Sequence, residues 1–101
     1  MWCMVMFDLP TKTKEQRREY TVFRNHLLDQ GFIQAQYSVY ARYLPSSVIT
    51  NRLVKGIRSY LPPGGEVRII QVSDRQWANT IRFTNASIVK SESEPEQLAF
   101  F

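Results

Sequence analysis

Hydrophobic and polar positions along the first half of the chain predict a strand, a helix and a pair of extended segments. The apolar run Trp2 to Asp8 predicts a strand. Residues 13–30 predict a helix, because Thr13 and Gln16 have capping-box spacing and a glycine follows at the C-terminal end. Polar residues alternate with apolar ones over residues 32–44. Since thirteen residues are long for one strand, we expect a bend near Tyr37–Ser38.

The second half of the chain predicts another helix, a strand and a short third helix. Residues 45–61 predict a helix that Pro45 opens, with an apolar stripe at helical spacing. A proline- and glycine-rich loop precedes a predicted strand at residues 66–72. Ser73 and Gln76 again have capping-box spacing, which predicts a short helix at about residues 74–81. We expect a loop at residues 84–96 and a last strand at residues 97–101.

This order of elements predicts an α+β fold, a ferredoxin-like βαββαβ sandwich with an antiparallel sheet and an extra C-terminal strand. A length of 101 residues fits one domain, 1–101. Both helices of such a sandwich cover one face of the sheet. The first strand and the strand at residues 66–72 are nevertheless apolar on both sides. The second apolar face predicts a two-fold homodimer packed sheet against sheet. The alternative is that the C-terminal segment folds back over that face.

The charge distribution indicates a polyanionic partner. The formal net charge is +4, but the last eleven residues contain three glutamates and no lysine or arginine, so residues 1–90 carry a net charge of +7. Basic groups release counterions condensed on phosphates, which favours nucleic-acid binding. A basic protein without such a partner is the alternative. The chain contains no apolar run near the ~20 residues of a membrane helix, no signal-peptide pattern and a single cysteine. These features favour the cytoplasm.

Asp8 is the most informative candidate for chemistry. It ends an apolar strand, and alternation places it on the face of Met4 and Met6. Carboxylate oxygens are natural Mg²⁺ ligands, and two copies of Asp8 brought together by a two-fold axis would make a better site than one. The alternative is an aspartate that forms a turn through nearby backbone amides.

The first predicted helix carries four cations, which are Lys14, Arg17, Arg18 and Arg24. At 100° per residue they lie within about a third of the circumference. They are candidates for contacts with duplex phosphates, and a solvated helix face is the alternative.

Other chemistry-bearing residues favour structural roles. His26 is the only histidine and is expected to be exposed on the helix, and Cys3 is expected to be a buried small apolar residue. Tyr37, Tyr40 and Tyr43 could form a platform for single-stranded nucleic acid, but alternation places Tyr37 on the core face.

Three sequence runs together resemble a known family. Phe7-Asp8-Leu9-Pro10 closes the first strand, and Gln36-Tyr37-Ser38-Val39-Tyr40 follows at a matching distance. Ser73-Asp74-Arg75-Gln76-Trp77-Ala78 is the third run. Over residues 1 to about 83 the chain resembles the small CRISPR-associated Cas-two family, and within it members from Cas-nine-type (type II) loci. Ala41 departs from the pattern, since many relatives have an acidic residue there.

The resemblance implies a ferredoxin-like homodimer that bridges two dimers of the integrase subunit, Cas-one, and holds double-stranded protospacer DNA during spacer acquisition. Some family members also have Mg²⁺-dependent endonuclease activity, and their metal-binding aspartate corresponds to Asp8. The resemblance thus implies one Mg²⁺ shared by two Asp8 residues. The leading hypothesis is a DNA-binding adaptor. A stand-alone Mg²⁺-dependent nuclease acting on RNA or DNA is the main alternative, and a small-ligand regulatory domain is a third.

Overall fold

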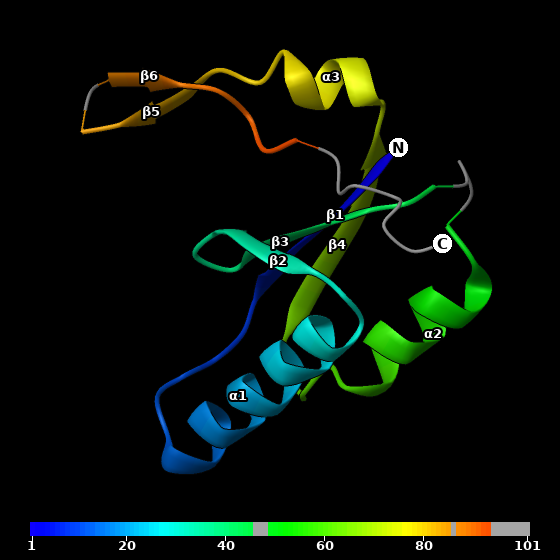
Figure 1. The fold of residues 1–101 in the computed structure, drawn as a ribbon. Helices are drawn as coiled ribbons and strands as arrows, with labels where there is room; N and C mark the ends of the chain where they lie inside the picture. Colours follow the sequence, from blue (N-terminus) through cyan, green and yellow to red (C-terminus); the bar gives the residue numbers. More distant parts are fainter. Residues whose placement is uncertain (46–48, 86, 94–101) are drawn as a thin grey trace.

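A four-stranded antiparallel sheet, in the order β2-β3-β1-β4, organises the chain. The computed structural model describes residues 1–45, 49–85 and 87–93. The elements of the main layer are β1 (Trp2–Asp8), α1 (Lys14–Asp29), β2 (Ile33–Gln36), β3 (Val39–Tyr43), α2 (Asn51–Ser59) and β4 (Glu66–Val72). Figure 1 shows α1 and α2 on the same side of this sheet. The predicted ferredoxin-like α+β fold is therefore confirmed.

Local signals set the ends of the helices. Thr13 and Gln16 form the predicted capping box of α1. The second helix begins later than predicted, at Asn51, because the Thr50 side chain caps it by accepting a hydrogen bond from the amide of Leu53 at 3.2 Å. Residues 46–48 of the predicted helix lie outside the described residues. No helix in the described parts of the chain is long and apolar enough to cross a membrane.

The extended segment bends where the sequence predicted. β2 and β3 are joined by Tyr37 and Ser38, and Ser38 adopts the left-handed backbone conformation with φ of 62°. The pairing of β2 with β3 also shifts register between Gln34 and Gln36. This shift breaks the simple alternation on which the sequence analysis relied for Tyr37.

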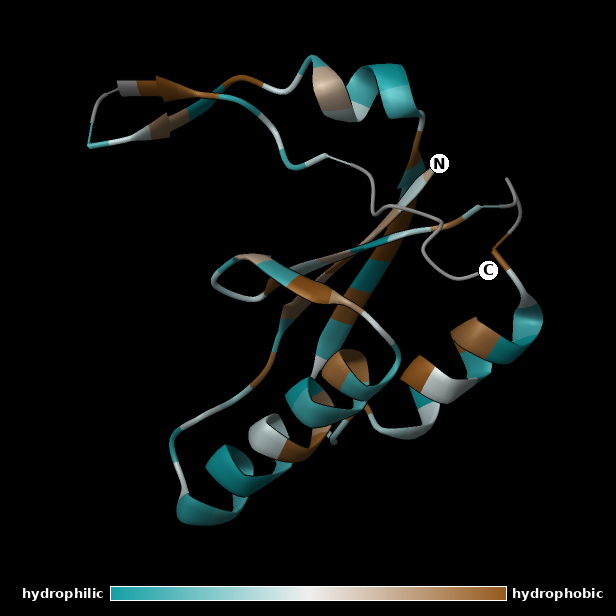
Figure 2. Cartoon of the chain, in the orientation of Figure 1, coloured by the Kyte–Doolittle hydropathy of each residue, from teal (hydrophilic) through white to brown (hydrophobic). Residues whose placement is uncertain are grey.

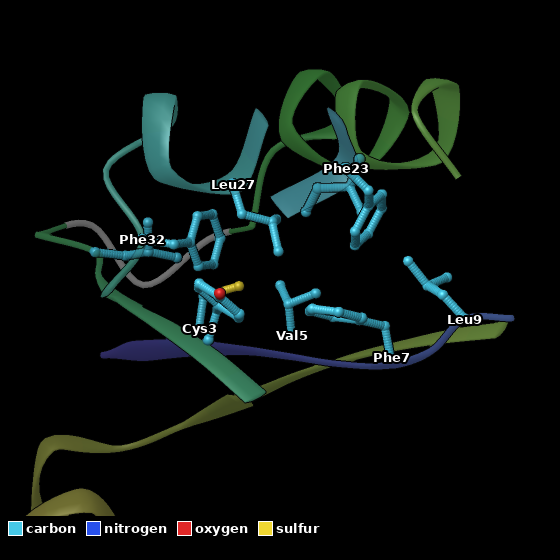
Figure 3. Close-up of a cluster of buried hydrophobic side chains, with 10 residues drawn as sticks. Cys3, Val5, Phe7, Leu9, Phe23, Leu27 and Phe32 are labelled. Carbon is cyan, nitrogen blue, oxygen red and sulfur yellow. The ribbon is translucent and has the colours of Figure 1, made fainter. Parts of the chain in front are cut away.

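The main core lies between the sheet and the two helices. Cys3, Val5 and Phe7 point from β1 toward the helices, as Figure 3 shows. They meet Phe23 and Leu27 of α1, which are fully buried. Alternation of side chains along β1 is the reason that these residues share one face, and Cys3 is buried as predicted.

Among the described residues, the opposite face of the sheet is covered only at one end. There α3 (Asp74–Ala78) places Trp77 against Trp2, with stacked rings whose centroids are 4.4 Å apart. The indole nitrogen of Trp77 donates a hydrogen bond to the carbonyl of Glu92 at 3.0 Å, which holds the chain beside α3. Ile33 and Ile70 on this face remain 45% and 41% exposed. The described part of the C-terminal half therefore covers this face in part and leaves Ile33 and Ile70 partly exposed.

The segment expected to be a loop contains a hairpin. β5 (Arg82–Thr84) pairs with β6 (Ser87–Val89), and Figure 1 shows the hairpin projecting from the body of the protein. The sequence analysis missed it because each strand has only three residues. The predicted helix at 74–81 also ends earlier, at Ala78. Residues 97–101, expected to form a last strand, lie outside the described residues.

Candidate functional site

Asp8 ends β1 on the open face of the sheet. The residues of β1 alternate in burial, and Asp8 is exposed at the end of the series. Its neighbour Phe7 donates a backbone hydrogen bond to the carbonyl of Ser38 at 3.1 Å, which ties this end of β1 to the β2–β3 turn. Leu9 is buried immediately afterwards. The backbone around Asp8 is thus fixed while its carboxylate faces solvent.

Glu66 lies directly across from Asp8 in the pairing of β1 with β4. Like charges opposite each other in a sheet repel, so this pair favours a cation nearby. One cation is already present, because Arg68 Nη2 lies 3.5 Å from the Glu66 carboxylate. The sequence analysis missed Glu66. Only the strand register reveals it, since 58 positions of sequence separate the two residues.

The four predicted phosphate-binding cations of α1 divide into two pairs. Lys14 and Arg18 are exposed, and no ion pair or side-chain hydrogen bond holds either of them among the described residues. Arg17 Nη1 instead donates to the carbonyls of Thr11 and Lys12, at 3.3 and 3.1 Å.

Arg24, the fourth cation, is half-buried and donates through Nε to the hydroxyl of Tyr40 at 2.8 Å. Tyr40 is fully buried, so this bond satisfies a polar atom that could not reach water. Lys14 and Arg18 are therefore the two members of the set whose charge is fully presented to solvent.

The aromatic residues considered as a stacking platform do not share a surface. Tyr40 is buried in the core, and Tyr43 packs edge-on against Trp2 with centroids 5.6 Å apart. Tyr37 is 69% exposed, so its predicted position on the core face was wrong. A hydrogen bond with Tyr20 raises the pKa of Tyr37. Together with Arg17, these two tyrosines line a hollow of about 380 Å³.

His26 and Cys3 do not form a reactive site. His26 is half-buried rather than exposed as expected, because it packs against α2. Burial raises the pKa of the Cys3 thiol to about 11, although Arg42 nearby opposes that shift. The thiol is therefore protonated at neutral pH and a poor nucleophile.

The residues present offer only a partial metal site in one chain. Carboxylate oxygens such as those of Asp8 are the hard donors that Mg²⁺ prefers. Within the described residues, no group of three or more histidine, cysteine, aspartate or glutamate side chains converges on one point. Asp8 alone therefore fits a magnesium ion that keeps most of its water and takes few ligands from the protein.

Exposed apolar side chains surround the open face. Ile33 and Ile70 are exposed at the two ends of a row across the four strands, with buried Ala41 and half-buried Met4 between them. The hairpin adds further exposed apolar residues, and Figure 2 shows hydrophobic positions on both of its strands. These residues are Ile81, Phe83 and Ile88, which are 74%, 62% and 74% exposed. A cavity of about 220 Å³ separates the hairpin from the sheet.

Comparisons with known proteins agree with the sequence resemblance. A family model described as CRISPR associated protein Cas2 matches residues 1–80. A Paracidovorax avenae protein named CRISPR-associated endoribonuclease Cas2 is 42% identical over 101 residues, covering 100% of this chain and 94% of that protein. A protein of the same name from Parvibaculum lavamentivorans is 37% identical over 101 residues, with complete coverage of both.

One solved structure supports the fold. A crystal structure of Streptococcus pyogenes Cas2 matches with a TM-score of 0.62 and covers 84% of this chain and 100% of that one. At 14% identity this likeness shows the shared fold alone.

Proposed function

Because the chain belongs to the CRISPR-associated Cas2 family, we propose that it is a homodimeric nuclease that cuts phosphodiester bonds at a metal site containing Asp8 of both copies. The exposed carboxylate of Asp8, at the end of β1 on the open apolar face, carries this proposal. The names of the relatives, CRISPR-associated endoribonuclease, support RNA as the substrate.

The open face supports a second copy as the partner. Ile33, Met4 and Ile70 form an apolar row, and the projecting hairpin presents more apolar surface. Several exposed large apolar side chains gathered on one side of a protein are typical of an interaction surface. Packing the open face of one chain against that of another would bury both faces. The Asp8 side chains of both copies would then lie at the contact between the two sheets.

The proposed division of labour follows from the geometry of one chain. Asp8 from each copy would hold the metal, while Lys14 and Arg18, on the helix layer, would bind phosphates away from the cleavage site. A bound Mg²⁺ would stabilise charge on the scissile phosphate and activate water. The fixed backbone at Phe7 and Leu9 would keep the carboxylate in place.

The test of this function uses purified protein and labelled oligonucleotides. Single-stranded RNA, single-stranded DNA and duplex DNA are incubated with Mg²⁺ and, separately, with EDTA. We expect RNA cleavage that requires Mg²⁺. Cleavage that persists in EDTA, or no cleavage of any of the three, would contradict a metal-dependent nuclease.

A second candidate is an adaptor that holds protospacer DNA and bridges integrase subunits. The observation that favours it is that the candidate phosphate-binding residues lie apart from the candidate metal ligand. Lys14 and Arg18 belong to the helix layer, whereas Asp8 lies on the opposite face of the sheet. A duplex could then be held without using Asp8. The test measures the duplex affinity of the Lys14→Gln/Arg18→Gln variant. We expect this affinity to fall below that of the wild type by the same factor for unrelated duplex sequences.

A further inference from the structure

Helix α2 presents a stripe of cations that neither proposed function uses. Arg52, Lys55 and Arg58 are spaced three residues apart and are all exposed. In the described parts of the chain, none of them has an ion-pair partner or a side-chain hydrogen bond. The helix contains no acidic residue at all. We call these three residues the α2 stripe.

The α2 stripe works against the stability of its own helix. Side chains three apart lie side by side on a helix, so both neighbouring pairs of the stripe bring like charges together. Arg52 also lies in the first turn, where the helix dipole favours negative charge. In α1, by contrast, the first turn contains Glu15. Arg58 lies in the last turn, where the dipole favours a cation, but the dipole and the charges within the helix do not explain Arg52 and Lys55. A negative partner that binds this face would explain them.

The interior of the protein explains the other face of α2. Ile57 is fully buried, and Leu53 packs against the main core. Gly56 and Tyr60 face α1, where Tyr60 stacks on His26. The cations thus occupy the only side of the helix that the described core and α1 leave uncovered.

We propose that the α2 stripe binds the phosphate backbone of a nucleic-acid duplex, as a second contact surface beside Lys14 and Arg18. The stripe extends about 9 Å along the helix, at 1.5 Å per residue. Successive nucleotides of one strand advance about 3.4 Å along a duplex, so the three cations match about three phosphates. This proposal rests on the duplex binding proposed above and extends it to a second helix.

An acidic segment of the same chain is the competing occupant. Glu92, the first of the three C-terminal glutamates, is held elsewhere. Its carboxylate lies 3.5 Å from Arg82, and its carbonyl accepts a hydrogen bond from Trp77 at α3. Glu94 and Glu96 are the remaining acidic residues of this segment, and the experiment below includes them.

The experiment measures duplex affinity against NaCl concentration with a short duplex of arbitrary sequence. The variant is Arg52→Gln/Lys55→Gln, and the control is Arg75→Gln/Lys90→Gln, which removes the same charge from exposed positions elsewhere. We expect the α2 variant to reduce the slope of log affinity against log salt by about 1.8, or 0.9 for each lost contact. Adding Arg58→Gln should reduce it by about 0.9 more. The control should leave the slope unchanged.

A second readout needs no ligand. Because the α2 variant removes both repulsive pairs of the stripe, it should melt at least about 2 °C higher than the wild type at low salt, and the difference should shrink in high salt. A lower melting temperature would mean that the two cations stabilise the folded chain, which contradicts the proposal.

Three outcomes separate the possible failures. If Lys14→Gln/Arg18→Gln lowers the salt slope and the α2 variant does not, the α2 stripe is not a contact surface and the proposed function survives. If the wild type shows no salt-dependent duplex binding, both the α2 contact and the proposed adaptor function are wrong. If Glu94→Gln/Glu96→Gln raises duplex affinity while the α2 variant leaves the slope unchanged, the acidic segment covers α2 and our proposal is overturned.

Discussion

The imidazole of His26 stacks on the ring of Tyr60, with centroids 4.2 Å apart and an angle of 21° between the planes. This pair joins α1 to the end of α2. The helices meet closely because Gly56 has no side chain, and a Cβ there would lie 3.4 Å from His26 Nε2. Nε2 is buried and has no hydrogen-bond partner among the described residues. A proton on this nitrogen would therefore have to be buried without an acceptor.

Stability should fall as the solution becomes mildly acidic. Burial lowers the pKa of His26 below its ordinary value of 6.5, although Asp29 nearby opposes the shift. The unfolded chain consequently binds a proton more readily than the folded one when the pH falls below about 6.5. We expect the free energy of unfolding to decrease from there downward, and to level off below the folded pKa. Urea unfolding between pH 8 and pH 5.5 measures this.

His26→Phe is the matched variant, since it keeps an aromatic ring for Tyr60 and removes the only histidine of the chain. Its stability should be nearly flat over the same pH range. A wild type whose His26 titrates at or above pH 6.5 by NMR would contradict this account.

The sequence predicted those parts of the fold that local signals determine. Thr13 and Ser73 cap their helices as expected, each within a capping box. Prediction failed where two local signals competed or where an element was very short. The sequence analysis started the second helix at Pro45 and did not consider Thr50, which caps α2, and the three-residue strands of the hairpin gave no recognisable period.

The candidate site was predictable only in the parts that one strand or helix defines. Asp8 could be identified because an apolar strand ends there. Glu66 could not, because its position opposite Asp8 depends on the register between two distant strands. Arg24 was grouped with Arg18 on helical spacing, but its partner Tyr40 comes from β3 and no periodicity within α1 reveals it.

Arg24 should matter more for stability than for phosphate binding. Arg24→Ala would leave the buried hydroxyl of Tyr40 without its partner, at a cost of about 1–3 kcal/mol. Arg18→Ala removes the same charge from an exposed position and should change stability by less than about 0.5 kcal/mol. Chemical denaturation of both variants measures the difference.

Tyr40→Phe provides the control for this hydrogen bond. In the Tyr40→Phe background no hydroxyl remains to be stranded, so Arg24→Ala should cost clearly less there than in the wild type. Equal costs in the two backgrounds would show that Arg24 stabilises the protein by other contacts.

A charge on the open face should disrupt the proposed dimer. Ile70 is 41% exposed and lies opposite Met4 in the apolar row. Ile70→Glu would place a carboxylate inside the sheet-to-sheet contact, where it has no partner. We expect wild type to sediment as a dimer at micromolar concentration and Ile70→Glu to sediment as a monomer.

Val54→Glu is the matched control, because Val54 is 38% exposed but belongs to α2 on the helix side. It should remain dimeric. A monomeric wild type would rule out the proposed dimer. A Val54→Glu variant that dissociates while Ile70→Glu stays dimeric would place the contact on the helix side instead.

Asp8 separates the two proposed functions. Asp8→Asn keeps the size of the side chain and removes the charge that would attract Mg²⁺. Since Asp8 is exposed and accepts no structural hydrogen bond within the described residues, the variant should fold. It should melt at or slightly above the wild-type temperature, because the repulsion with Glu66 is removed. If Asp8 is a metal ligand, Mg²⁺-dependent cleavage of RNA should fall by at least about 100-fold.

Duplex binding by the same variant should be unaffected or slightly stronger, because a negative charge near phosphate has been removed. The decisive comparison is cleavage in vitro beside spacer acquisition in cells, both with Asp8→Asn. Lost cleavage with normal acquisition would mean that the two activities use different surfaces, as the separation of Asp8 from Lys14 and Arg18 predicts. Lost acquisition by a variant that still dimerises and binds duplex would make the metal site essential to both. Cleavage equal to that of the wild type would show that Asp8 is not a metal ligand.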